Sequence, residues 1–374
     1  MEHIAGLNPE GNENRNRIFH CIRQNKIISR PAIARELELS LPTVTTYLQE
    51  LEDNGMIYKN GSLGNTGGRR AAGYSVVRDK YIAAGIDLTE TYLMVTLVDL
   101  NGDVLRSEKK ECVFSNDAVY WNGAKDFVDS VLDQCGRQDT VVLGIGIAVQ
   151  AIVTKDHSGI FYVKTMDIDN LTSEMLEDYF QYPCLLFNDA NAAGYGEIFR
   201  RPEADNLFYI GLSDNVGGSI LIDNKPFGGQ LSKSGEIGHI TVHPEGKQCY
   251  CGQRGCLDAY CSASVLKKTL NVSIDGFFAG LAEGNEQYQE YWEEYLDMLA
   301  IAVADIRNLF DCEIVLGGYI GSRMEAYLPE IRKRVATRNP FEDDADYLTT
   351  CIVKEEALSY GSALYLVHQF WEKI

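Results

Sequence analysis

The sequence predicts an α/β protein with two lobes, preceded by a small helical domain that carries a β-hairpin. Two observations lead to this prediction. Near the N-terminus, apolar residues recur with helical spacing in three short segments, and a glycine-rich stretch flanked by β-like residues follows them. From Tyr81 onward, β-rich runs such as YIAAGIDL and VVLGIGIAV alternate with helical segments such as SEMLEDYF. This alternation is typical of a sheet covered by helices, and it occurs twice in series.

The length of 374 residues favours two or three domains over a single core. We expect the helical domain with its wing and a linker over residues 1–78, which we call the head, and a first α/β lobe over residues 79–199. A second lobe should cover residues 200–374, with a last helix that returns to the first lobe. A hydrophobic fraction of 45% and a charged fraction of 24% fit a folded globular protein.

The N-terminal segment MEHIAGLNPEGNENRNR lacks the basic and then apolar pattern of a signal peptide, and no apolar run is long enough to span a bilayer. We therefore expect a cytoplasmic protein with no membrane partner. The ten cysteines are unevenly distributed along the chain. In a reducing compartment, clustered cysteines favour a metal site over a disulfide framework.

The net charge of −20 is divided unevenly between the head and the rest of the chain. Residues 11–80 hold eleven basic and seven acidic side chains, a balance of +4. Residues 1–10 contribute −2, which leaves −22 for residues 81–374. The asymmetry indicates separate roles, because contacts to nucleic-acid phosphates need Lys and Arg and an acidic body would repel them.

The first two helices of the head are predicted by apolar spacing and by start signals. Ile18 and Ile22 fall on one helical face, and this helix should end near Asn25. A second helix should begin after Ser29 as its N-cap, with Pro31 in the first turn, where a missing N–H costs nothing. Its predicted buried residues are Ala32, Ile33 and Leu37.

The third helix has the same kind of start signal. Ser40 is its predicted N-cap, Pro42 lies in the first turn, and Asn54-Gly55 ends it. Its predicted buried face consists of Val44, Leu48 and Leu51. Three short helices with a tight turn between the last two are typical of a helix-turn-helix, and β-like pieces around residues 56–58 and 73–77 add the hairpin of a winged helix.

The outward face of the third helix predicts a DNA-binding surface. Opposite the buried residues lie Thr43, Thr45, Thr46 and Gln49. Such side chains can meet base edges in a major groove, whereas Arg69 and Arg70 in the wing should supply phosphate contacts because this helix face carries no Arg or Lys. The alternative is a small helical bundle with surface threonines that binds nothing. The winged pattern and the local positive balance together favour DNA binding.

A stretch rich in Cys and Gly, GEIGHITVHPEGKQCYCGQRGC, predicts a metal site. Its spacing is His-x9-Cys-x-Cys-x4-Cys, and the expected ligands are His239, Cys249, Cys251 and Cys256. One imidazole and three thiolates form the donor set of a closed, structural Zn²⁺ site. The second ring nitrogen of His239 would face a cleft. The alternative is a loop of unliganded thiols, and we expect Cys261 and His243 to be packing or surface residues.

The segment FNDAN predicts a ligand site at the end of a strand. Asn188 and Asp189 follow an apolar run, at the edge where open α/β sheets place their ligand groups. An Asp beside a sugar hydroxyl can accept its proton and activate it for attack on a phosphate. The alternative is a turn Asp preceded by an N-cap Asn, which is common turn chemistry.

Three motifs together resemble the ROK family of sugar kinases and sugar-responsive repressors, within the actin-like sugar-kinase fold. They are FNDANAAGYGE at 187–197, the Cys/His stretch and IVLGGYIGS at 314–322. A winged head before such a body resembles the repressors of the family. The resemblance implies that Asn188, Asp189, Glu236 and His239 hold sugar hydroxyls, and that Asp189 corresponds to the catalytic Asp of the kinases. It also implies a sugar contact at Asp258, where most relatives have Glu.

Three segments depart from the kinase pattern of this family. Asp87-Leu88-Thr89-Glu90-Thr91 replaces Asp-x-Gly-Gly-Thr, and the segment from Ser213 to Gly218 replaces Gly-Thr-Gly-x-Gly-Gly. Side chains stand where glycines let the backbone approach phosphate, and Glu90 and Asp214 add negative charge. We therefore expect no kinase activity and no catalytic residue. The third departure, Ala148-Val149-Gln150 in place of Pro-Gly-Pro, alters the expected sugar pocket.

The sequence as a whole predicts a sugar-responsive transcriptional repressor with structural Zn²⁺. Its expected partners are a duplex DNA operator, a monosaccharide or sugar derivative, and further copies of the chain in a homodimer or homotetramer, because two-fold operators match dimers. One alternative is an active ATP-dependent sugar kinase fused to a DNA-binding head. The other is a scaffold that binds no ligand and only dimerises the heads.

Overall fold

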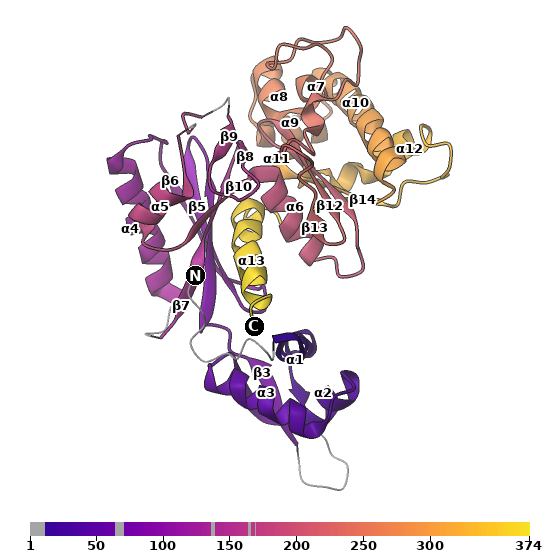
Figure 1. Cartoon of the computed structure of the whole chain (residues 1–374). Helices are drawn as coiled ribbons and strands as arrows, with labels where there is room; N and C mark the ends of the chain where they lie inside the picture. Colours follow the sequence, from indigo (N-terminus) through magenta and orange to yellow (C-terminus); the bar gives the residue numbers. More distant parts are fainter. Residues whose placement is uncertain (1–11, 64–70, 136–138, 164–165, 169) are drawn as a thin grey trace. The chain divides into compact units, whose positions relative to one another are not determined.

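The computed structural model describes residues 12–63, 71–135, 139–163, 166–168 and 170–374, which form two compact units (Figure 1). The first unit contains the described residues up to Ile147, together with Leu171–Leu185 and Ser362–Ile374. The second contains the described residues of Ala148–Asn170 and Leu186–Gly361. The domain boundaries expected at residues 78 and 199 stay predictions.

The head has the secondary structure of a winged helix-turn-helix, as predicted. Its elements are α1 Asn12–Asn25, β1 Ile28–Ser29, α2 Arg30–Glu36, α3 Leu41–Asp53, β2 Ile57–Leu63 and β3 Ala71–Val76. The strands form an antiparallel sheet in the order β1-β3-β2. Ser40 caps α3, because its Oγ accepts a hydrogen bond from the Thr43 N–H at 3.2 Å. The sequence did not predict the short strand β1.

The buried face of α3 is confirmed, and that of α2 is corrected. Val44, Leu48 and Leu51 are buried, as expected. On α2 only Ile33 is buried, whereas Ala32 and Leu37 are partly exposed. The difference arises because α2 has seven residues and Leu37 is its C-cap, so the short helix presents one full contact position to the core.

In the first unit, α1 also contacts the end of the chain. The buried Arg15 side chain donates to the Ile374 carbonyl oxygen, and Asn16 donates to the Trp371 carbonyl oxygen. The guanidinium of Arg23 lies 4.1 Å from the centroid of the Trp371 ring, which is within cation–π range. The helix α1 of the head is therefore packed against the C-terminal segment.

The first α/β sheet has the strand order β10-β7-β4-β5-β6. Its strands are β4 Tyr81–Leu88, β5 Tyr92–Asp99, β6 Val104–Glu111, β7 Val141–Val149 and β10 Cys184–Asn188. Its helices are α4 Ala118–Cys135 and α5 Ser173–Phe180, and α4 packs on β5 and β6 (Figure 1). Part of the last helix, α13 Ala357–Trp371, lies close to β7, because a Cβ at Gly146 would overlap the Ser362 carbonyl.

The second sheet has the strand order β13-β12-β11-β14-β15. Its strands are β11 Leu207–Leu212, β12 Val216–Ile222, β13 Lys225–Pro226, β14 Glu313–Gly317 and β15 Leu348–Thr350. β11 pairs antiparallel with β12 and parallel with β14, so this sheet is mixed. A separate two-stranded sheet is formed by β8 Ile152–Val153 and β9 Ile160–Tyr162.

In the second unit, α10 Glu286–Phe310 packs against several other helices. The other helices are α6 Asp189–Phe199, α7 Asp258–Cys261, α8 Ala263–Leu270, α9 Ile274–Ala282, α11 Gly318–Gly321 and α12 Leu328–Ala336, with short 3-10 turns at Ile237–His239 and Met324–Tyr327. α6 packs on β11 and β12, and α10 contacts α7, α9, α12 and β14 (Figure 1). In the part of the chain that the structure describes, no helix combines the length and apolarity needed to cross a membrane.

Candidate functional site

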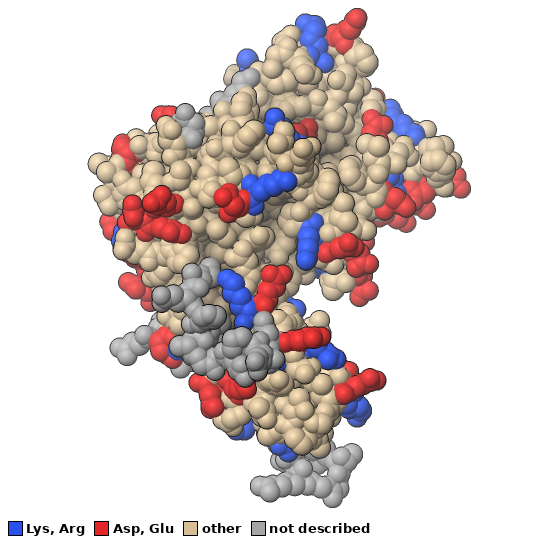
Figure 2. Space-filling view, viewed as in Figure 1, with Lys and Arg blue, Asp and Glu red and all other residues tan. Residues whose placement is uncertain are grey.

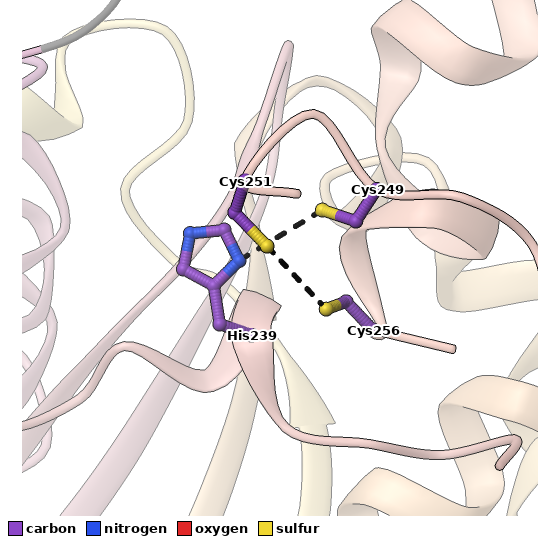
Figure 3. A group of neighbouring side chains, drawn as sticks. All are labelled: His239, Cys249, Cys251 and Cys256. Atoms are coloured by element: carbon purple, nitrogen blue, oxygen red, sulfur yellow. Dashed lines mark hydrogen bonds between the residues drawn. The ribbon is translucent and has the colours of Figure 1, made fainter. Parts of the chain in front are cut away.

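The four predicted metal ligands converge in the second unit. His239 ends the 3-10 turn Ile237–His239, and the three cysteines lie in the loop that follows it. One donor atom from each residue lies within 4.8 Å of the others. Figure 3 shows the three sulfur atoms and one ring nitrogen of His239 directed toward a common point. The structure therefore brings together all four residues that the spacing predicts.

The distances within the cluster fit a tetrahedral zinc site. The Cys249 Sγ lies 3.9 Å from the His239 Nδ1, and the Sγ atoms of Cys251 and Cys256 are 3.7 Å apart. Sulfur ligands about 2.3 Å from a tetrahedral ion would be about 3.8 Å from one another. Burial raises the pKa of Cys249 to about 12 and also raises the pKa of Cys256, so these thiols need a cation to act as thiolates. The arrangement can hold a metal ion.

A glycine keeps the metal loop tight, and the spare candidates lie outside the cluster. A Cβ at Gly255, whose φ is +79°, would overlap the His243 carbonyl oxygen, so only glycine fits there. The His243 side chain is exposed and meets the Tyr260 ring edge-on at 6.1 Å. Cys261 is fully buried, and its Sγ lies 3.6 Å from the Tyr295 carbonyl oxygen.

A cavity of about 290 Å³ lies beside the metal cluster, within the second unit. Four of the five predicted sugar-binding residues line it, namely Asn188, Asp189, Glu236 and His239. Its other lining residues are Gln150, Ala151, Ile152, Tyr162, Val163, Ala190, Asn215, Val216, Gly217, Gly218, Lys233, Tyr250 and Cys251. The size and the mixture of polar and aromatic groups suit a small polar ligand.

Asn188 and Asp189 form the start of α6 at the edge of this cavity. The Asn188 Oδ1 accepts a hydrogen bond from the Asn191 N–H at 3.0 Å, and its Nδ2 donates to the Ala151 carbonyl oxygen at 3.1 Å. Asn188 is therefore an N-cap and a lining residue at once. The Asp189 Oδ1 accepts from the Ala190 N–H at 2.8 Å. The turn interpretation and the ligand interpretation of this motif do not exclude each other.

The two acidic groups of the cavity have raised pKa values. Burial, together with a smaller contribution from the negative charge of Glu236, raises the pKa of Asp189 to about 6. The walls around Glu236 exclude water from part of its carboxyl and raise its pKa, although the side chain is exposed at the opening. Near neutral pH both groups can accept hydrogen bonds from ligand hydroxyls.

His239 connects the metal cluster to the cavity through Tyr250. Its Nδ1 faces the thiols, and its Nε2 lies 3.3 Å from the Tyr250 hydroxyl. Tyr250 was not predicted as a lining residue, although its place between two expected metal ligands, in the turn closed by the bond from the Gly252 N–H to the Cys249 carbonyl oxygen, was a usable signal. Tyr162 and Lys233 were also overlooked, and Lys233 gave no signal beyond its nearness to Glu236 in the sequence.

The fifth predicted sugar residue, Asp258, lies outside this set of lining residues. It is buried, and its Oδ1 accepts a hydrogen bond from the Val216 N–H at 2.7 Å. Burial raises its pKa to about 6. Asp258 thus anchors the start of β12, a strand whose first residues line the cavity. Its direct contact with a sugar stays a prediction.

The two segments that replace the kinase phosphate loops differ in their charge environment. Glu90 is exposed in the turn between β4 and β5. Asp214 forms an ion pair with Lys267 at 2.5 Å and lies 3.4 Å from the Ser264 hydroxyl. The lysine offsets part of the negative charge of Asp214, so the electrostatic argument against phosphate binding is weaker there than the sequence suggests.

The predicted DNA-binding residues of α3 lie on its outward face, where Thr45, Thr46 and Gln49 are exposed and Thr43 is partly exposed. An open groove of about 730 Å³ runs beside them. Arg69 and Arg70 lie outside the described residues. In the view of Figure 2, acidic side chains cluster on the body among scattered basic ones, which agrees with the net charge of −20.

Comparisons with known proteins match both parts of the chain. The sequence profile of the ROK family matches residues 83–364, and the profile of the winged helix-turn-helix DNA-binding family matches residues 12–58. The xylose repressor of Caldicellulosiruptor bescii is 26% identical over 346 residues, which are 86% of this chain and 87% of that protein. The xylose repressor of Bacillus subtilis is 30% identical over 263 residues, 67% of this chain and 66% of that protein.

The DNA-binding transcriptional dual regulator NagC of Escherichia coli is 24% identical over 340 residues, 86% of this chain and 84% of that protein. Among solved structures, a ROK family transcriptional regulator described as a homologue of the Escherichia coli MLC protein shares the fold with a TM-score of 0.78, at 22% identity over 98% of both chains. A ROK family glucokinase from Streptomyces griseus gives a TM-score of 0.63 at 24% identity, over 76% of this chain and 98% of its own. The chain therefore belongs to the ROK family, and it carries a winged helix-turn-helix head at its N-terminus.

Proposed function

We propose that this chain is a sugar-responsive transcriptional repressor. Its head binds a duplex DNA operator, its cavity binds a monosaccharide or a sugar derivative, and ligand binding changes the affinity for the operator. The observation that carries the proposal is the presence, in one chain, of a winged helix-turn-helix head and a polar cavity lined by Asn188, Asp189, Glu236 and His239. The names of the xylose repressors and of the DNA-binding transcriptional dual regulator among the relatives support it.

The cavity supplies hydrogen-bonding groups of both kinds for sugar hydroxyls. The carboxylates of Asp189 and Glu236 accept hydrogen bonds, and the side-chain amides of Gln150 and Asn215 can both donate and accept them. Tyr162 adds an aromatic surface for the apolar side of a sugar ring. These groups are matched to a neutral or weakly charged polyol.

We propose that His239, Cys249, Cys251 and Cys256 hold a structural Zn²⁺. Bound there, the ion would neutralise the thiolates and fix the position of the loop. With the Nδ1 of His239 committed to the ion, the ring proton would sit on Nε2, which lies 3.3 Å from the Tyr250 hydroxyl oxygen and could donate to it. The two cavity residues His239 and Tyr250 are thereby held in one orientation, ready to meet the ligand.

We propose that the chain lacks sugar kinase activity, as its repressor relatives suggest. Side chains replace glycines in the two segments that correspond to the kinase phosphate loops, residues 87–91 and 213–218. Glu90 is an exposed negative charge in the first of these segments. The runner-up function is an active sugar kinase, which the cavity position of Asp189 and the fold shared with a glucokinase favour. Sugar-dependent ATP turnover that disappears in Asp189→Asn would establish that alternative.

The proposed repressor acts as a homodimer or a larger homo-oligomer in the cytoplasm. A single head has a balance of only +4 over residues 11–80, which gives weak binding to DNA at physiological salt. Two heads on a two-fold operator add their contacts, and their spacing can be altered by the ligand. Sedimentation velocity with and without operator DNA checks the oligomeric state.

The test of the proposed function is an operator titration with and without each sugar of a panel, on wild type and on Glu236→Gln. The wild type should change its operator affinity with one sugar or a few related ones. Glu236→Gln should bind the operator normally and lose the response, because it removes a charge-assisted hydrogen bond worth about 1.5–3 kcal/mol. Glu283→Gln, an exposed change at the C-cap of α9, is the matched control.

Two results would contradict the proposal. A wild type whose operator affinity ignores every sugar that binds it would leave only a DNA-binding protein with an unrelated sugar site. A protein whose thermal unfolding temperature is shifted by no sugar in the panel would favour the scaffold that only dimerises the heads.

A further inference from the structure

Two of the residues predicted to read DNA on α3, Thr45 and Thr46, have their hydroxyl donors engaged within the protein. The Thr45 hydroxyl donates to the Leu41 carbonyl oxygen at 2.7 Å, and the Thr46 hydroxyl donates to the Pro42 carbonyl oxygen at 3.3 Å. A hydroxyl has one hydrogen to donate, so neither can also donate to a base. The Gln49 Nε2 donates one of its two hydrogens to the Asp53 Oδ1 at 2.7 Å, and the Thr43 and Ser40 hydroxyls lie 2.7 Å apart. The face of α3 thus offers few donors, and none of them is charged.

Arg30 supplies donors to the same face from a different helix. It is the first residue of α2 and is exposed, and its NH1 donates to the Thr45 Oγ1 at 3.1 Å. It lines the open groove together with Leu41, Thr46 and Gln49. A guanidinium has five N–H donors, so the bond to Thr45 leaves others for a ligand. The hydroxyl of Thr45 holds the guanidinium beside the outward face of α3.

The charges along α3 indicate which half of this face approaches DNA. The acidic residues of the helix, Glu50, Glu52 and Asp53, all lie in its last four positions. Glu50 pairs with Arg15, and Glu52 pairs with Lys59 at 2.9 Å. These pairs offset part of the charge of Glu50 and Glu52, and Asp53 adds a further carboxylate that disfavours phosphates, whereas Arg30 lies beside the N-terminal half at Thr45. The half of α3 near Arg30 is therefore better suited to approach the DNA major groove than the C-terminal half.

We infer that Arg30 reads a guanine of the operator in the major groove, from a position fixed by its hydrogen bond to Thr45. This inference rests on the proposed DNA-binding function. It assigns to Arg30 of α2 the charged donor that the outward face of α3 does not carry. Guanine presents the N7 and O6 acceptors side by side, and arginine is the side chain that most often meets both. The engaged hydroxyl of Thr45 acts as a positioning group, so Thr45 itself adds only the apolar contact of its methyl.

The test selects binding sites for the full-length protein from a pool of random duplex DNA, with wild type, Arg30→Ala and Arg30→Lys. Wild type should enrich a guanine at one position of each half-site. Arg30→Lys keeps the charge but loses the planar fork, so it should lose most of that preference while keeping the salt dependence of binding. Affinity of Arg30→Ala for the best site should fall about 5- to 150-fold, with little change for sites that lack the guanine.

A matched pair at Thr45 tests the positioning step. Thr45→Ser keeps the hydroxyl that accepts from Arg30, whereas Thr45→Val keeps the shape and removes it. Thr45→Val should weaken the guanine preference by a smaller factor than Arg30→Ala does, and Thr45→Ser should keep that preference. The far-ultraviolet circular dichroism and unfolding temperature of each variant check that the head remains folded, which is expected because both positions are exposed.

Two results would overturn the inference alone. If Arg30→Ala selects the same sequences as wild type, Arg30 reads no base. If it weakens all sequences by one factor and lowers the salt slope by about one, Arg30 is a phosphate contact. A wild type that enriches no sequence would instead overturn the proposed function, and this inference with it.

Discussion

The metal cluster and the outward face of α3 were both predicted from the identity and spacing of four residues, but their side chains have different partners in the structure. His239 and the three cysteines direct their donor atoms to one point, within 4.8 Å of one another. Thr45, Thr46 and Gln49 instead bond to their own helix. Buried thiols need a shared partner, whereas exposed hydroxyls satisfy themselves locally. Spacing therefore indicates the function of a closed cluster more completely than that of an open face.

The largest expected effect is on the metal cluster. Cys251→Ser should reduce copurified zinc from about one ion per chain to almost none, because a hydroxyl is a poor zinc ligand. It should also lower both the unfolding temperature and the response to sugar, since the proposed ion would fix His239 and Tyr250. Metal analysis and thermal unfolding check this, with Cys112→Ser outside the cluster as the control. Wild type that holds no zinc when purified without chelator would remove the metal from the proposal.

The next effect concerns the DNA side, through the wing. Arg69→Ala combined with Arg70→Ala should weaken binding to all sequences by a similar factor and reduce the salt slope by about two, because each arginine is expected to neutralise one phosphate. Binding isotherms at several salt concentrations measure this. An unchanged salt slope would mean that the phosphate contacts lie elsewhere on the head.

A smaller effect on stability separates two possible roles of Asp258. Asp258→Ala should destabilise the protein by about 1–3 kcal/mol, because the buried Val216 N–H loses its acceptor. Asp258→Asn keeps an acceptor oxygen and should cost less. Urea unfolding of both variants gives the comparison. If the two variants unfold alike but only one loses sugar affinity, Asp258 acts on the ligand rather than on β12.

The smallest effect is the pH dependence of sugar binding. The pKa of Asp189 is about 6 because of burial and the charge of Glu236. A sugar hydroxyl donates to the ionised carboxylate, so affinity should rise as pH increases from 5 to 7 and should be about tenfold weaker at pH 5. Isothermal titration calorimetry across this range checks it. Asp189→Asn should flatten the curve, and a wild type without pH dependence would show that Asp189 does not accept from the ligand.

Much of the local structure follows from short stretches of sequence. Ser40 and Asn54-Gly55 mark the ends of α3 because caps and left-handed turns act within a few residues. The metal ligands are close in the sequence, so one loop can bring them together. The predicted burial of Ala32 and Leu37 was wrong. Periodicity indicates which face of a helix is apolar, but it does not indicate how much of that face is covered by other residues.

The sequence alone determined that a winged head precedes an α/β body, which four residues form the candidate metal cluster, and which family the chain resembles. Only the tertiary structure decided that Arg30 lies beside Thr45, fifteen positions away on another helix, and that Asp258 binds the Val216 backbone. It also decided that Lys267 offsets the charge of Asp214. These contacts join segments that no local pattern relates, because they form only when helices and strands pack and each buried or half-buried polar group takes the partner that packing provides.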